Sequence, residues 1–153
     1  VWIGSAASIR DFPWTPIEPR PSEEHREAKL RWLLVVETTW STVDDWICHH
    51  HLGAIARMDA TGRRVASTPS KLYALVPTPY PYKCPQNTTH SVLWLTASMR
   101  NEEVTQLLEQ LLPKSDFVWY FNPTPTLNHT KLWRHAQVFH RDNLPGASPA
   151  APL

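Results

Sequence analysis

The stretch Asp116–Asn122, with the sequence DFVWYFN, decides the fold. Its five inner residues are all large and apolar or aromatic, which is typical of a strand that is covered on both faces. We therefore expect this strand to be central in a sheet.

Three other segments predict the rest of that sheet. His90–Thr96 (HSVLWLT), His135–His140 (HAQVFH) and Lys71–Val76 are strand-length runs rich in apolar, β-branched or aromatic residues. The proline-aromatic segment Pro77–Pro85 is predicted to be irregular, because proline cannot donate to a sheet ladder. A short helix is predicted around residues 126–134.

A helix is predicted between two of the strands. Asn101 can cap a helix that runs from Glu102 to about Leu112. Its apolar residues recur at helical spacing, at Val104, Leu107, Leu108, Leu111 and Leu112.

Two further helices are predicted in the first half of the chain. Ser22 can cap a helix over residues 23–39, since Glu23 and Glu24 favour a helix start. We expect this helix to bury one broad face, formed by Leu30, Trp32, Leu33, Leu34, Val35 and Val36.

The second helix begins after Ser41, its candidate cap, with Asp44 as the reciprocal partner, and stops at Gly53. The basic segment that follows, Ala54–Ser70, predicts a mobile loop that covers a cleft.

The order helix, helix, strand, strand, helix, strand, strand predicts an α+β domain. We expect a mostly antiparallel sheet of about four or more strands, with the two N-terminal helices and the inserted helix packed on one face. Residues 1–21 are predicted to form an extended proline-aromatic arm, residues 22–142 a single domain, and residues 143–153 a flexible tail.

Composition narrows the partners of this 153-residue chain. A net charge of +1 indicates neither nucleic acid nor an anionic membrane, and no apolar run reaches the roughly 20 residues of a membrane span. We expect a cytoplasmic protein that binds a small molecule. The sequence leaves the oligomeric state open, and a homodimer is one option. Two cysteines, Cys48 and Cys84, are expected to be ordinary thiols.

The most conspicuous polar cluster is Asp44–Gly53, DDWICHHHLG. On a helix three consecutive histidines fan through about 200°, so they cannot converge on one ion. We expect Asp45 and His49 to pair on the surface, and Trp46, Ile47 and His50 to face inward. His50 is then the one useful imidazole of the cluster.

The candidate site lies instead on the last predicted strand, where His135, Gln137 and Arg141 share a face. His135 is the predicted acid or base and Arg141 the predicted catalytic cation. The predicted substrate-binding groups are Tyr80, Tyr82, His90, Asn122, Lys131 and Gln137.

The alternative readings are an exposed polar edge of the sheet or a metal site built from His90, His135 and Asp116. No spacing in the sequence demands a metal, and we expect neither a metal nor an organic cofactor.

Several segments resemble a known family. The second half contributes His90–Trp94, Val118–Pro123 and Leu132–Arg141, and the first half contributes Leu30–Trp32, Trp40–Val43 and Trp46–Ile47. Together they resemble, over roughly residues 28–141, the N-acetylglucosamine-induced protein family, a largely fungal family with a domain of unknown function. The resemblance implies an intracellular fungal protein with a part in nutrient response or specialised metabolism.

These observations favour a cofactor-independent acid-base enzyme that performs a cyclisation, isomerisation or elimination in a metabolic or biosynthetic pathway. The alternative is a non-catalytic ligand-binding or protein-interaction regulator in amino-sugar response.

Overall fold

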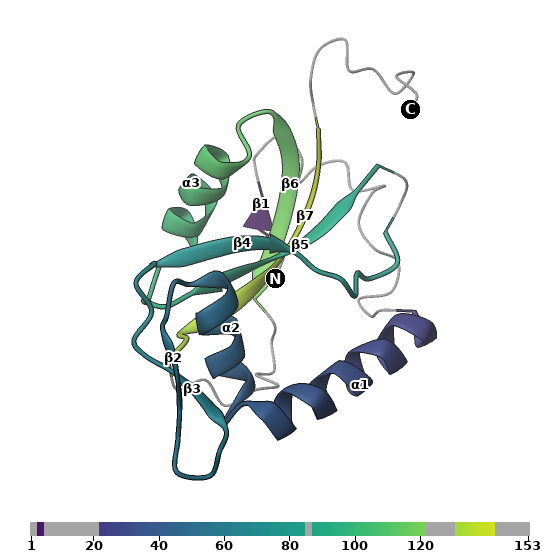
Figure 1. Cartoon of the computed structure of the whole chain (residues 1–153). Coiled ribbons are helices and arrows are strands. Elements are labelled where there is room, and N and C mark those ends of the chain that lie inside the picture. The colour runs from purple at the N-terminus through teal and green to yellow at the C-terminus, as the bar shows by residue number, and fades with distance from the viewer. Residues whose placement is uncertain (1–2, 5–21, 85–86, 122–130, 143–153) are drawn as a thin grey trace.

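The computed structural model describes residues 3–4, 22–84, 87–121 and 131–142 (Figure 1). Within these residues it has three helices and seven strands. The strands form an antiparallel sheet in the order β1-β6-β7-β5-β4 and a separate two-stranded hairpin, β2-β3. The predicted α+β class is confirmed.

The main sheet follows the predicted strands closely. Its strands are β1 (Ile3–Gly4), β4 (Tyr73–Pro77), β5 (Thr89–Leu95), β6 (Ser115–Phe121) and β7 (Arg134–Asp142). β6 is covered on both faces as predicted, since Phe117, Val118 and Trp119 are all buried. The middle strand of the sheet is β7, and β6 lies next to it. An apolar sequence indicates that both faces of a strand are covered, but it does not indicate how far the strand lies from the edge of the sheet.

Helix α3 (Asn101–Leu111) packs on one face of this sheet. Val104, Leu107 and Leu108 are its buried residues, and they join a cluster that contains Leu93, Phe117, Trp119 and Val138. Asn101 is the first residue of the helix and not its cap. The helix start is fixed by Glu103, whose carboxylate accepts from the Arg100 backbone N–H at 3.0 Å.

Helix α1 (Glu23–Thr39) has the predicted bounds, and the Ser22 hydroxyl accepts from the His25 N–H at 3.3 Å. The predicted broad buried face is wrong: only Val36 is buried, while Leu30, Leu34 and Val35 are 52%, 64% and 63% exposed. The helix packs along a narrow stripe, formed by Trp32, Leu33, Val36 and the following Trp40.

Helix α2 (Val43–His51) is capped one residue later than predicted. The Thr42 hydroxyl accepts from the Asp45 N–H at 3.1 Å and donates to the Asp45 carboxylate at 2.6 Å. Ser41 pairs through its backbone N–H with Arg64 O at 2.8 Å. Gly53, with φ of 73°, ends the helix as predicted.

The segment Ala54–Ser70 is not the predicted loop, because it forms the hairpin of β2 (Ala56–Met58) and β3 (Arg64–Ala66). The Asp59 carboxylate closes its turn by accepting from the backbone N–H groups of Thr61 and Arg63 at 2.8 and 3.0 Å. An aspartate followed three residues later by a glycine was the turn signal in the sequence.

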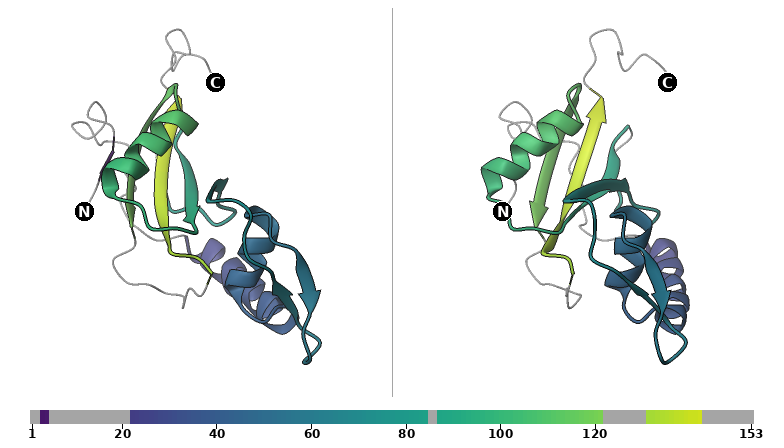
Figure 2. Two further views of the ribbon diagram at one scale, coloured as in Figure 1. Left: turned by 90° about the vertical axis from the view of Figure 1, so that its left-hand side faces the viewer. Right: turned by 60° about the vertical axis from the view of Figure 1, so that its left-hand side comes forward.

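The prediction that all three helices pack on one face of the sheet is wrong. α3 lies on one side, whereas α1, α2 and the hairpin lie on the other side towards one end (Figure 2). The reason is that strands alternate their side chains: Leu93 faces α3, and its neighbour Trp94 packs against the cluster of α1 and α2.

Three predicted segments lie largely outside the described residues: the arm apart from β1, the tail, and the helix over residues 126–134. Residues 131–134, which are described, are not helical. No helix in the described part of the chain combines the length and apolar character that crossing a bilayer requires.

Candidate functional site: an aromatic cavity between the helices and the sheet

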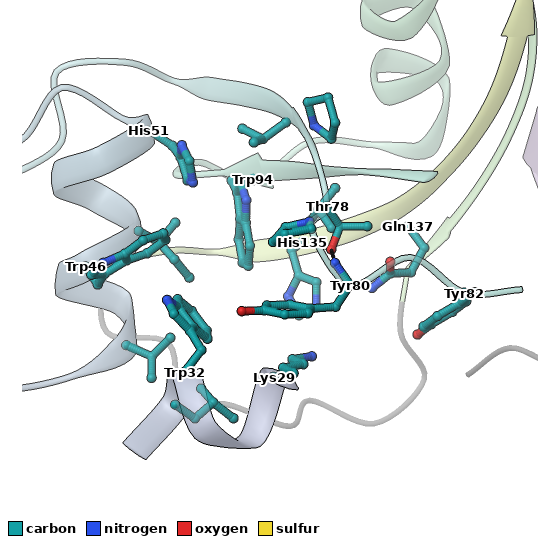
Figure 3. Close-up of a pocket in the computed structure, with 17 residues that line it drawn as sticks. Lys29, Trp32, Trp46, His51, Thr78, Tyr80, Tyr82, Trp94, His135 and Gln137 are labelled. Carbon is teal, nitrogen blue, oxygen red and sulfur yellow. Dashed lines mark hydrogen bonds between the residues drawn. The ribbon is translucent and has the colours of Figure 1, made fainter. Parts of the chain in front are cut away.

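A cavity of about 380 Å³ lies between α1, α2 and the face of the sheet opposite α3 (Figure 3). Seventeen described residues line it: Lys29, Trp32, Leu33, Val43, Trp46, Ile47, His51, Val76, Pro77, Thr78, Pro79, Tyr80, Tyr82, Val92, Trp94, His135 and Gln137. The predicted cleft is therefore present at Tyr80 and Tyr82, but α1 and α2 close it in place of the segment Gly53–Ser70.

Aromatic rings form much of the cavity wall. Trp32 meets Trp46 edge to face, with ring centroids 4.8 Å apart, and lies 6.2 Å from the Tyr80 ring. Trp94 contributes from β5 on the far side. Flat, apolar walls of this kind favour a ligand that is itself planar and largely apolar.

β5 and β7 present alternate residues to the cavity, because side chains two residues apart on a strand point to the same face. Trp94 lies opposite His135, and Val92 lies opposite Gln137. The His135 ring is half-buried and its centroid is 5.0 Å from that of Trp94. The prediction that His135 and Gln137 share a face is thus confirmed, and both side chains line the same cavity.

His90 lies behind Gln137 and holds its side chain in place. The Tyr82 backbone N–H donates to His90 Nδ1 at 3.0 Å, so the neutral ring carries its proton on Nε2. Nε2–H then donates to Gln137 Oε1. Burial lowers the pKa of His90 to about 4, so this arrangement persists at neutral pH. His90 does not line the cavity, and its predicted substrate contact is replaced by a positioning contact.

The three histidines of α2 diverge as predicted, but a different one reaches the cavity. His49 and His50 each use Nδ1 on a backbone carbonyl, of Ala54 and Trp46, at 2.9 Å. His50 is exposed, and His51 lines the cavity. Burial, and then the neighbouring His50, lower the pKa of His51.

Lys29 lines the cavity, and sequence reasoning did not select it. It projects from α1, whose placement over the sheet is a tertiary feature without a local signal. Lys29 is exposed to solvent and also lines the cavity, so it lies at the cavity mouth. Desolvation along the wall lowers its pKa.

Two predicted cations lie away from the cavity. Arg141 is six residues beyond His135 on β7, a separation of about 20 Å along a strand, and the buried Phe139 lies between Gln137 and Arg141. Lys131 forms an ion pair with Asp45. Asn122 lies outside the described residues.

Asp45 is buried and not at the surface, and its predicted pair with His49 is wrong. Its carboxylate accepts from Lys131, from Thr42 and from the Ala66 N–H at 2.9 Å. Burial alone would raise the pKa of Asp45, but these bonds outweigh it and hold the pKa below its usual value. Asp45 therefore ties α2 to β3 and to Lys131.

The two cysteine thiols pack in apolar clusters. Burial raises the pKa of Cys48 and of Cys84 to about 11, so both remain neutral thiols at pH 7. Among the described residues, no three His, Cys, Asp or Glu side chains are grouped to hold a metal ion.

The cavity can therefore enclose a small planar molecule, offer it imidazoles for proton transfer and hold its polar end with N–H donors. Comparison of the chain with protein-family models, curated proteins and solved structures gives no match, so its similarity to the N-acetylglucosamine-induced protein family stays a prediction.

Proposed function

We propose that the protein is a cofactor-independent acid-base enzyme that binds a small, planar, largely apolar molecule in the aromatic cavity. His135 is the proton-transfer group, and Gln137 orients the substrate. A cyclisation, isomerisation or elimination suits the cavity, because each needs enclosure, orientation and one proton shuttle.

One observation carries this proposal. His135 and Gln137 occupy alternate positions of one rigid strand and both line a cavity whose walls are mainly aromatic and aliphatic. An imidazole and an oriented amide in such surroundings act on a bound molecule with little competition from water.

Metabolite profiles of cells that make the protein test the proposal. Wild-type protein should deplete one metabolite and generate another, and His135→Gln should abolish that change while the melting temperature stays within a few degrees. His25→Gln is the matched control, since His25 lies at the start of α1 and does not line the cavity. Full activity of His135→Gln would contradict the assignment.

A non-catalytic ligand-binding regulator is the second candidate, and the position of Arg141 favours it. The cation predicted for catalysis does not line the cavity, which leaves fewer polar groups for chemistry than the sequence predicts. The family resemblance suggests amino-sugar response as its setting. Thermal stabilisation by a metabolite that is recovered unchanged would support this candidate over the enzyme.

A further inference from the structure

The cavity lining carries one fixed cation, Lys29, and no fixed anion in the described part of the chain. None of the lining residues in the described part of the chain is an aspartate or a glutamate. Lys29 can only donate, and Gln137 has its oxygen already engaged by His90. The described lining therefore offers no carboxylate to a cationic ligand.

The bond from His90 determines which end of the Gln137 amide faces the ligand. His90 Nε2–H can only donate, since Nδ1 already accepts the Tyr82 N–H, so the Gln137 oxygen points towards His90. The amide nitrogen is left for the cavity. Gln137 is 94% buried and lines the cavity, so its amide N–H₂ can donate to an acceptor atom on a bound ligand.

Lys29 adds a positive charge at the same end of the cavity. Its charge is close enough to His90 to contribute to the low pKa of that ring. Lys29 and Gln137 both lie towards Tyr80, whereas His51 and Trp46 lie at the far end (Figure 3).

Building on the proposed function, we infer that the ligand is an ionised aromatic carboxylic acid. The aromatic walls hold its ring, and its carboxylate lies between the Lys29 ammonium and the Gln137 amide N–H. His90 is a positioning residue that keeps the amide in the donor orientation. A charge-assisted bond of this kind distinguishes the acid from a neutral analogue by about tenfold or more in affinity.

Two probes with the same ring system and similar size test the inference: 2-naphthoate and the uncharged 2-naphthalenemethanol, titrated by calorimetry into the full chain. We expect naphthoate to bind at least about tenfold more tightly. Lys29→Met and Gln137→Met should each remove most of this preference, and Lys29→Arg should retain it. Lys114→Met is the matched control, because Lys114 is exposed and does not line the cavity.

The variant His90→Phe tests whether His90 orients the Gln137 amide or only packs against its neighbours. Phenylalanine can keep the stacking on Phe139, where the rings now lie 4.5 Å apart, but it cannot donate to Gln137. The variant should lose the preference for naphthoate and keep its affinity for the alcohol, which also shows that the cavity is intact.

The remaining outcomes are distinguishable. Equal binding of both probes, or tighter binding of the alcohol, overturns the carboxylate inference and leaves the proposed function standing. Binding of neither probe overturns both, since a cavity of this size and lining should accept a bicyclic ring.

Discussion

At the scale of single residues, His90 shows how a buried imidazole can serve a site that it does not enter. It is 4% exposed and links the backbone of Tyr82 to the side chain of Gln137. Its neutrality is a requirement of the fold, because a proton on Nδ1 would face the Tyr82 N–H.

Acid should therefore destabilise the protein through His90. The unfolded ring binds a proton below its ordinary pKa of 6.5, whereas the folded ring stays neutral down to about 4. Its contribution is complete above pH 6.5 and is lost as the pH falls towards 4, by about 3 kcal/mol. Urea denaturation across this range measures the loss.

His90→Phe is the matched variant for that series. It should show a flatter pH dependence between 4 and 6.5, although His51, whose pKa is also lowered, contributes with the same sign. Asp45 adds a separate loss only below its ordinary pKa of 3.8. An unchanged slope in His90→Phe would show that the ring is not the source.

Lys131→Met should destabilise the fold by about 2 kcal/mol, because it leaves the buried Asp45 carboxylate without its cation. The cost stays below that of a fully buried pair, since the Lys131 side chain is 28% exposed and Asp45 keeps two other donors. Lys114→Met is the control, and chemical denaturation of both variants is the measurement. Equal stability of the two variants would contradict this role of the ion pair.

The sequence predicted part of the candidate site at this scale. The two-residue period of a strand identified His135 and Gln137 as neighbours on one face. The same period included Arg141, because it fixes the face and not the distance along it. Lys29 and His51 could not be chosen, since the positions of α1 and α2 over the sheet depend on tertiary packing.

At the scale of secondary-structure elements, the end of α2 depends on a glycine in the left-handed region. Gly53→Ala should cost about 2 kcal/mol: alanine at φ of 73° is strained, and its Cβ would lie 2.2 Å from Ser70 Oγ, displacing the bond to Gly53 O.

Gly62→Ala is the matched control for this position. Gly62 has a similar φ of 82° but open space around it, so its substitution should cost only the backbone strain, about 1 kcal/mol. Thermal or urea denaturation of the pair isolates the contribution of Ser70. Equal costs would show that Ser70 adjusts freely.

Element prediction succeeded where hydrophobic periodicity was strong and failed where other interactions decide. The strands around Trp94 and Trp119 and the helix around Leu108 were evident from pattern. The β2-β3 hairpin was missed because its pairing is anchored by Asp45 and by a short turn, neither of which leaves a periodic signal. The exposed side of α1 was misjudged because apolar composition does not report whether a partner is present.

At the scale of the whole molecule, the sheet separates two differently packed sides. The α3 side is a dense core, whereas the side of α1 and α2 encloses the cavity. This asymmetry places the free volume where both a strand face and a helix can supply side chains to it.

Filling that volume should block binding without weakening the fold. Val92→Phe introduces a ring opposite Gln137 and should abolish 2-naphthoate binding, while the melting temperature stays equal or rises. Val35→Phe on the exposed side of α1 should leave binding unchanged. Quenching of cavity tryptophan fluorescence and thermal denaturation report the two quantities. Retained naphthoate binding in Val92→Phe would place the ligand elsewhere.

The uneven anchoring of α1 has a kinetic consequence. Its single buried residue, Val36, and the following Trp40 lie at its carboxyl end, whereas Lys29, Trp32 and Leu33 form cavity wall nearer its amino end. The fully buried contacts of α1 are therefore concentrated at its carboxyl end, while Trp32 and Leu33 are only partly buried. We expect a bound molecule to leave when the part of α1 that forms the cavity wall moves away from the sheet. Val36→Ala should therefore shorten the residence time of the ligand without altering a group that lines the cavity.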